Sequence, residues 1–209
     1  IRYRNGPSGY YNLGFKRVLD LLVVLLSAPF TAPVVLFLAL FIACYGGSPF
    51  YNQPRVGKNG RIYKMWKLRT MVKEADKNLT AYLEANPTAQ AEWDKTQKLK
   101  HDPRITRFGL LLRKTSLDEL PQLWNVFKGD MSLVGPRPMM PEQQHFYPGS
   151  AYYSLRPGIT GLWQVSARNN STFADRANFD DKYSRELSFF NDLGLLLATP
   201  GVVLKATGH

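Results

Sequence analysis

The chain has only one cysteine in 209 residues, Cys44, so its sequence allows no intrachain disulfide. A lone cysteine is typical of proteins that fold in a reducing, cytoplasmic setting. The three histidines, His101, His145 and His209, show no metal-ligand spacing, which argues against a zinc site. Internal repeats and low-complexity runs are also lacking, and the length fits one domain or one domain with an anchor.

Charge is absent from the apolar residues 21–45. A straight helix of this length extends about 37 Å, enough to cross a hydrocarbon core about 30 Å thick. Two features favour a re-entrant helix-break-helix, in which the helix is interrupted and the chain leaves by the leaflet it entered. Basic residues flank the segment on both sides. A helix that crosses the membrane once carries its basic residues mainly on the cytoplasmic side, so two basic flanks favour a segment with both ends on that side. Pro29 and Pro33 lie near its middle, where each removes a backbone donor and forces a bend. The residues alone leave both arrangements open.

Acidic residues are scarce in the first third of the chain. Residues 1–74 contain 11 Lys and Arg but only 2 Asp and Glu, whereas residues 75–209 contain 16 and 14. Of the net charge of +11, +9 therefore lies in the first 74 residues, around the apolar segment, and only +2 lies beyond them. This distribution favours anionic membrane lipids over nucleic acid as a partner, because each basic residue beside a membrane contributes about 1 kcal/mol at an acidic leaflet.

The rest of the chain predicts an α+β fold, mostly helical with one small β-hairpin. Residues 50–68 predict the hairpin, with Asn59-Gly60 supplying positive φ in its turn. Residues 74–98 predict helix with a break at Pro87. The remaining expectations are ordered loops at 136–141 and 156–161, a surface helix over 174–189, and a short apolar stripe over 192–205 that lies in the core or at the membrane interface.

Residues 116–138 are the most informative part of the sequence. They set Asp118 and Glu119 between Arg113 on one side and Arg137 on the other. A carboxylate can attack phosphorus or hold a divalent metal, and guanidinium groups bind phosphate oxygens through two parallel bonds. Two prolines flank Arg137 and lower the entropy cost of holding it in place. The pattern favours chemistry on a phosphate, and the nearby apolar segment suggests a lipid-linked one.

Asp118 and Glu119 also have a structural explanation. Residues 116–119 match a capping box, in which Ser116 and Glu119 satisfy the first amides of a helix. In an arbitrary sequence this would be the commoner explanation. Pro121 would remove a hydrogen bond if Ser116 were the cap, and would be harmless if Asp118 were. Either register places both carboxylates at a helix N-terminus, which also attracts phosphate.

Other cations and aromatic residues are weaker candidates. Lys67 and Arg69 close the hairpin and are expected to bind nucleotide phosphate or lipid phosphate. Trp163 and Gln164 are candidates for contact with a base or a sugar, although a buried packing role is equally open for the tryptophan. Further arginines of the same kind are Arg104, Arg107 and Arg168. Asp130 is expected in a turn.

Several motifs resemble one protein family when they are taken in order along the chain. They are Lys16-Arg-Val-Leu-Asp20, Gln53-Pro-Arg-Val-Gly57, Trp66-Lys-Leu-Arg-Thr-Met71, Asp102-Pro-Arg-Ile-Thr-Arg107, the block at 116–138 and Arg156-Pro-Gly-Ile-Thr-Gly-Leu-Trp-Gln-Val165. The set resembles the bacterial monotopic phosphoglycosyl transferases, which start exopolysaccharide and O-antigen synthesis on undecaprenyl phosphate. The resemblance extends from about residue 16 to about residue 205. One departure is Ala32-Pro33, where the family usually has Ser-Pro at the kink.

The resemblance implies a re-entrant membrane helix at residues 16–46 and a catalytic domain at 47–209, on the cytoplasmic face of the bacterial inner membrane. It also implies a ping-pong reaction. Asp118 attacks the sugar-bearing phosphorus of a UDP-sugar and releases UMP, and polyprenyl phosphate then takes the phosphosugar. Mg²⁺ is the implied cofactor, with Asp118 and Glu119 as its nearest ligands. Residues 74–100 resemble the hexose-transferring branch, which favours UDP-galactose or UDP-glucose.

Two rival hypotheses stay open at this point. In the first, the same substrates react directly in a ternary complex, with Asp118 as general base. In the second, a single-pass protein carries a basic domain that binds lipid or nucleic acid without catalysis. An oligomer is compatible with the sequence.

Overall fold

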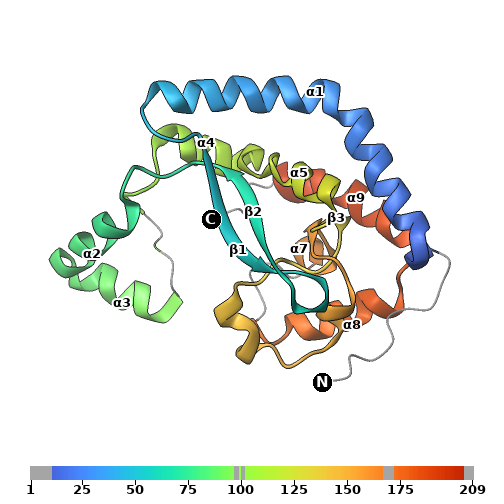
Figure 1. Cartoon of the computed structure of the whole chain (residues 1–209). Coiled ribbons are helices and arrows are strands. Elements are labelled where there is room, and N and C mark those ends of the chain that lie inside the picture. The colour runs from blue at the N-terminus through green and yellow to red at the C-terminus, as the bar shows by residue number, and fades with distance from the viewer. Residues whose placement is uncertain (1–10, 97–98, 100–101, 167–171, 205–209) are drawn as a thin grey trace.

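The structure, a computed structural model, describes residues 11–96, 99, 102–166 and 172–204. A five-residue π-helical turn (Tyr11–Phe15) leads into the long helix α1 (Lys16–Cys44), which lies along one side of a mixed α and β domain (Figure 1). The other helices are α2 (Ala75–Ala85), α3 (Pro87–Thr96), α4 (Arg107–Thr115), α5 (Gln122–Lys128), α6 (Ala151–Ser154), α7 (Leu162–Ser166), α8 (Arg176–Arg185) and α9 (Phe189–Leu204). The predicted class, mostly helical with a small hairpin, is confirmed.

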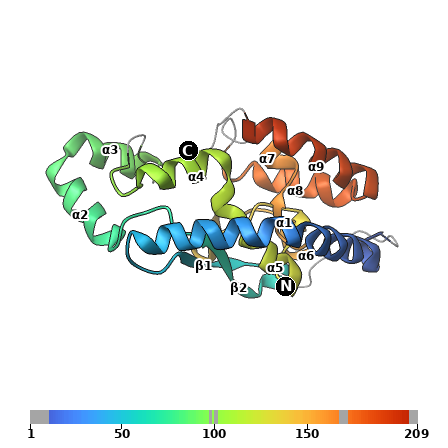
Figure 2. The same cartoon turned by 90° about the horizontal axis from the view of Figure 1, so that it is seen from above.

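The predicted hairpin is present. Strand β1 (Phe50–Val56) pairs antiparallel with β2 (Ile62–Leu68), and Phe50 lies opposite Leu68. The turn between them has φ of 58° at Asn59 and 77° at Gly60, the left-handed conformation that Asn-Gly favours. The predicted break at Pro87 is also present, because α2 ends at Ala85 and α3 begins with the proline. These two helices form an arm that extends away from the domain (Figures 1 and 2).

A second sheet was not predicted. Strand β3 (Ser132–Val134) pairs in parallel with β4 (Gly158–Thr160), so the prediction of a loop throughout 156–161 is wrong. Each strand has three residues, too few to show an alternating pattern, and the partner strand is distant in sequence. The segment at 136–141 is a loop as predicted up to Met140, and a 3₁₀ helix (Pro141–Phe146) follows it.

Helix α1 is bent but unbroken. It continues through Pro29 and Pro33, and Figure 1 shows it changing direction along its length. The expected interruption is therefore wrong, because the chain accommodates both prolines by bending. In this stretch the Ser27 hydroxyl donates to the Val24 carbonyl (3.1 Å) and the Thr31 hydroxyl donates to the Ser27 carbonyl (3.1 Å).

Most apolar side chains of α1 do not contribute to the core. Leu26, Phe30 and Phe37 are 74%, 77% and 68% exposed. Among the described residues, α1 is the one helix long and apolar enough to cross a membrane. Such exposure of large apolar side chains marks an interaction surface rather than a water-facing one.

The two ends of α1 are fixed to the domain. Near its start, Asp20 is buried and accepts hydrogen bonds from the Ser132 hydroxyl (3.1 Å) and the Leu133 amide (3.0 Å) of β3. Lys16, in the first turn of the helix, forms an ion pair with Asp192 of α9. Its last turns pack into a small apolar cluster of Leu38, Ala39, Ile42, Leu68 and Leu112. The bent helix therefore reaches from α9 to the open end of the hairpin, where the cleft described next is found.

Candidate active site

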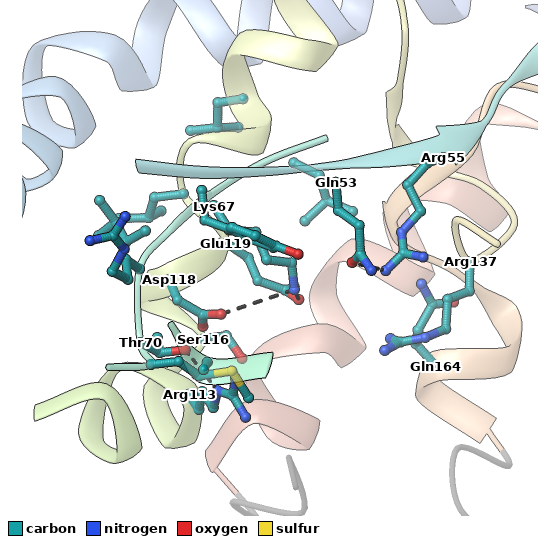
Figure 3. A pocket seen from close by; sticks show the side chains of 18 of the residues that line it. Gln53, Arg55, Lys67, Thr70, Arg113, Ser116, Asp118, Glu119, Arg137 and Gln164 are labelled. Atoms are coloured by element: carbon teal, nitrogen blue, oxygen red, sulfur yellow. Dashed lines mark hydrogen bonds and ion pairs between the residues drawn. The ribbon is translucent and has the colours of Figure 1, made fainter. Parts of the chain in front are cut away.

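A cleft of about 780 Å³ is bordered by the hairpin, α4 and the chain that follows it (Figure 3). All six of the stronger candidates for substrate contact line it. They are Lys67, Arg69, Arg113, Asp118, Glu119 and Arg137. The fold therefore brings together residues from three separate parts of the sequence.

Asp118 and Glu119 are presented by a single 3₁₀ turn, Leu117–Glu119, and the predicted capping box is wrong. Ser116 instead ends α4 in the left-handed conformation, with φ of 56°, and its side chain makes no capping hydrogen bond. Helix α5 starts only at Gln122, directly after Pro121. The proline lacks a backbone donor, which a residue inside a continuous helix would need. The two carboxylates are therefore held between two helices.

The Asp118 carboxyl is the most buried acid in the cleft. The residue is 7% exposed, and burial raises its pKa to about 6. The neighbouring Lys67 ammonium, 4.0 Å from Oδ2, and Arg113 act in the opposite direction, while the negative charge of Glu119 raises the pKa further. At neutral pH the group is mostly ionised, yet it is more basic than an ordinary aspartate.

Two cations flank the acidic pair. Lys67, near the end of β2, forms an ion pair with Glu119 through Nζ and Oε1, 2.6 Å apart. Arg113, in the last turn of α4, is fixed by a bond from its Nε to the Thr70 hydroxyl (2.9 Å). Both cations favour an anion beside Asp118.

Arg137 is held by a rigid loop on the other side of the cleft. The Gly135 amide donates to the Thr160 carbonyl (2.9 Å), and the Gly158 amide donates to the Pro136 carbonyl (2.9 Å). A Cβ added to Gly135 would lie 2.3 Å from the Arg156 carbonyl oxygen, so only glycine allows this approach. These contacts fix the backbone on either side of Arg137.

The structure separates the weaker candidates. Arg104 is buried, forms an ion pair with Asp102 (2.6 Å) and also lines the cleft, whereas the exposed Arg107 lies outside the lining. Trp163 is buried, with the guanidinium groups of Arg137 and Arg176 at 5.6 and 4.3 Å from its ring, so the packing interpretation is confirmed. Gln164 lines the cleft. Arg168 lies outside the described residues.

Three cleft residues on β1, Tyr51, Gln53 and Arg55, were missed. Gln53 and Arg55 lie with Arg137 and Gln164 on the side of the cleft away from Asp118, and Arg55 donates to the Gln53 side chain (2.6 Å) (Figure 3). The alternation of a strand could have found them. Tyr51 pairs with Lys67 and also lines the cleft, so positions 51, 53 and 55 share its face.

The acidic pair fits a magnesium ion. Among the described residues, no group of three or more His, Cys, Asp or Glu side chains could hold a metal alone. Mg²⁺ instead uses one or two carboxylates and completes its octahedron with water and substrate phosphates. Asp118 and Glu119 supply two carboxylates, and the cleft of about 780 Å³ leaves room for water and substrate phosphates beside them.

Comparison with known proteins identifies the family. The family model described as bacterial sugar transferase matches residues 11–206. The chain belongs to this family. It is 44% identical over 210 residues to the UDP-galactose-lipid carrier transferase of Erwinia amylovora, and 40% identical over 210 residues to the undecaprenyl-phosphate galactose phosphotransferase of Salmonella typhimurium. Both alignments cover 100% of this chain but only 44% of the relative.

A shorter relative aligns along most of its length. An exopolysaccharide production protein of Rhizobium meliloti is 44% identical over 194 residues, which cover 91% of this chain and 86% of the relative. The bacterial sugar transferases are thus the family that the ordered motifs predicted, and the prediction of an enzyme of the transferase class is confirmed.

Proposed function

We propose that the protein transfers hexose 1-phosphate from a UDP-hexose to polyprenyl phosphate, with release of UMP. The observation that carries this proposal is Asp118, a buried, basic carboxylate beside cations in one cleft. The two longer relatives are named for UDP-galactose and for undecaprenyl phosphate, which supports UDP-galactose as the first donor to test and undecaprenyl phosphate as the acceptor. UDP-glucose is the second donor. The product would begin an exopolysaccharide or an O-antigen.

The first step is attack by an Asp118 oxygen on the sugar-bearing phosphorus. The new oxygen–phosphorus bond replaces the bond to the bridging oxygen, which leaves with UMP. The enzyme then carries an acyl phosphate of the sugar, which is reactive enough to pass the phosphoryl group onward. Lys67 and Arg113 lie where they can stabilise the charge on the phosphate oxygens during this step.

The second step returns Asp118 to its starting state. An oxygen of polyprenyl phosphate attacks the same phosphorus, the Asp118 carboxylate leaves, and the product is a polyprenyl diphosphate sugar. Two anionic substrates would repel each other if both were bound at once, so a covalent intermediate separates them. Mg²⁺ bound by Asp118 and Glu119 would neutralise the donor diphosphate. The ion pair with Lys67 holds the Glu119 carboxylate at the cleft, beside Asp118.

Helix α1 supports a membrane location. Its exposed apolar side chains fit a hydrocarbon environment, and its bend together with basic residues on both flanks fits re-entrance into one leaflet. A re-entrant helix would keep the cleft on the cytoplasmic face of the inner membrane, where UDP-sugars are made. The lipid phosphate would then approach from the membrane surface.

Intact mass spectrometry tests the covalent step. Protein in nanodiscs is incubated with Mg²⁺ and UDP-galactose or UDP-glucose, without lipid acceptor, and analysed without acid. We expect a phosphohexose adduct and UMP from the wild type, and neither from Asp118→Asn. Asp181→Asn, at an exposed carboxylate on α8, is the matched control and should form the adduct normally.

The other outcomes separate the rival hypotheses. Product with acceptor but no adduct without it would favour direct transfer, with Asp118 as general base. An adduct that survives Asp118→Asn would place the nucleophile elsewhere. If neither donor gave UMP, with or without acceptor, the proposed reaction would be wrong and a binding domain without catalysis would become the better hypothesis.

A further inference from the structure

Gln164 carries an unsatisfied amide into the cleft. The residue is 8% exposed and lines the same cavity as Asp118. Neither its side-chain oxygen nor its side-chain nitrogen has a hydrogen-bond partner among the described residues. A buried amide without partners destabilises a fold, so such a group is expected to receive its partners from a ligand.

The position of this amide is fixed by the backbone around it. Gln164 lies in α7, which begins directly after Gly161. A Cβ added to Gly161 would lie 2.0 Å from the Gly135 carbonyl oxygen and 2.9 Å from Gln164 Oε1. The amide therefore lies over a glycine that packs tightly against the loop of Arg137. Because the same contact positions both side chains, Gln164 is preorganised relative to that cation.

Gln164 and Asp118 lie on opposite sides of the cleft. Figure 3 shows Gln164 beside Arg137 and near Arg55, while Asp118 lies with Lys67 and Glu119 across the cavity. A nucleotide sugar is built in the order sugar, two phosphates, ribose and base. If its sugar-bearing phosphorus is at Asp118, the sugar stays close to that side and the base reaches farthest from it.

We infer that Gln164 recognises the uracil base of the donor through paired hydrogen bonds. The amide oxygen accepts from the N3–H of the base, and the amide nitrogen donates to an adjacent carbonyl. Uracil presents this donor and acceptor side by side on one edge, and a carboxamide is complementary to both. The inference rests on the proposed function, because it assumes a UDP-sugar as the donor.

The test compares two ligands that differ only in the base. UMP and ribose 5-phosphate are titrated by calorimetry into the protein in nanodiscs. Wild type should bind UMP at least about tenfold more tightly than ribose 5-phosphate, since two neutral hydrogen bonds supply about that factor. Gln164→Leu should lose most of this preference while ribose 5-phosphate binds as before. Gln144→Leu, outside the cleft lining, is the matched control and should keep the preference.

A second variant protects the test against a folding defect. Gln164→Glu keeps the volume of the side chain but removes its two amide donors, so it should also lose the preference for UMP. A preference for UMP that survives in folded variants would overturn the inference. Equal weakening of both ligands would indicate a structural role only, and a change confined to the KM of the UDP-hexose would indicate contact with the sugar.

These outcomes are distinct from a failure of the proposed function. If the wild type releases UMP from a UDP-hexose and the variants keep their preference for UMP, only the base contact is wrong. If the wild type releases no UMP and does not distinguish UMP from ribose 5-phosphate, both proposals are wrong.

Discussion

Replacing Asp118 with asparagine should stabilise the fold while it abolishes UMP release. Burial raises the pKa of this carboxyl from 3.8 to about 6, so the ionised form is disfavoured in the folded protein. A difference of about two pKa units corresponds to about 3 kcal/mol of unfolding free energy at neutral pH, at 1.36 kcal/mol per unit. The residue is only 7% exposed, so solvent screens little of this. Asparagine is neutral and nearly isosteric, and it removes the penalty.

The sign of the pH dependence follows from the raised pKa. Well below pH 3.8 the carboxyl is protonated in the folded and unfolded states alike, and it contributes no penalty. As the pH rises from 4 to 6 the unfolded chain loses the proton first, so the wild type loses stability relative to the asparagine variant. Above about pH 7 the difference should be constant, at about 3 kcal/mol.

Thermal unfolding in metal-free buffer between pH 4 and pH 8 measures this difference. For a chain of this size, 3 kcal/mol corresponds to a Tm about 6–12 °C higher in the variant at pH 7.5. Asp181→Asn, at an exposed carboxylate, should change Tm little at any pH and serves as the control. A variant less stable than wild type at pH 7.5, or a difference independent of pH, would refute the assignment of Asp118 as a buried, destabilised base.

Two further substitutions address the cations. Lys67→Met removes the positive charge that lowers the Asp118 pKa, so the acidic limb of the pH profile of kcat/KM for UMP release should move to higher pH. An unchanged acidic limb would show that Lys67 does not act on the ionisation of Asp118. Arg137→Lys should raise the KM for UDP-hexose about tenfold with a smaller effect on kcat, because lysine cannot make two parallel bonds to a phosphate. Arg185→Lys, on the exposed face of α8, is its control, and equal KM values would argue against phosphate contact.

Local turn chemistry made part of the fold predictable. The Asn59-Gly60 pair fixes the hairpin and Pro87 fixes the start of α3, and both depend on residues within one or two positions. The grouping of Asp118 with Arg137 was also predictable, because their residue types imply a shared chemistry. For the same reason the six stronger candidates for substrate contact line one cleft.

Features that depend on distant contacts were not predictable. The pairing of β3 with β4 rests on glycines that let two loops touch, and neither loop alone shows it. Ser116 matched a capping box in sequence, yet it ends the preceding helix in a left-handed conformation. Pro121 cannot lie inside a helix that begins at Ser116, so the carboxylates lie in a 3₁₀ turn and α5 starts only at Gln122.

Two buried polar side chains of the cleft, Asp118 and Gln164, differ in their contacts from a buried acid elsewhere in the domain. Asp180 is also buried, and burial raises its pKa to about 7, but its carboxylate accepts a 2.7 Å hydrogen bond from Tyr147 and it lies outside the cleft lining. The Asp118 carboxylate lies 4.0 Å from the Lys67 ammonium, and the Gln164 amide has no hydrogen-bond partner within the described chain. Both side chains face the same cavity. A folded chain keeps two such destabilising groups in one place when a ligand completes their contacts, and a nucleotide sugar would reach both at once.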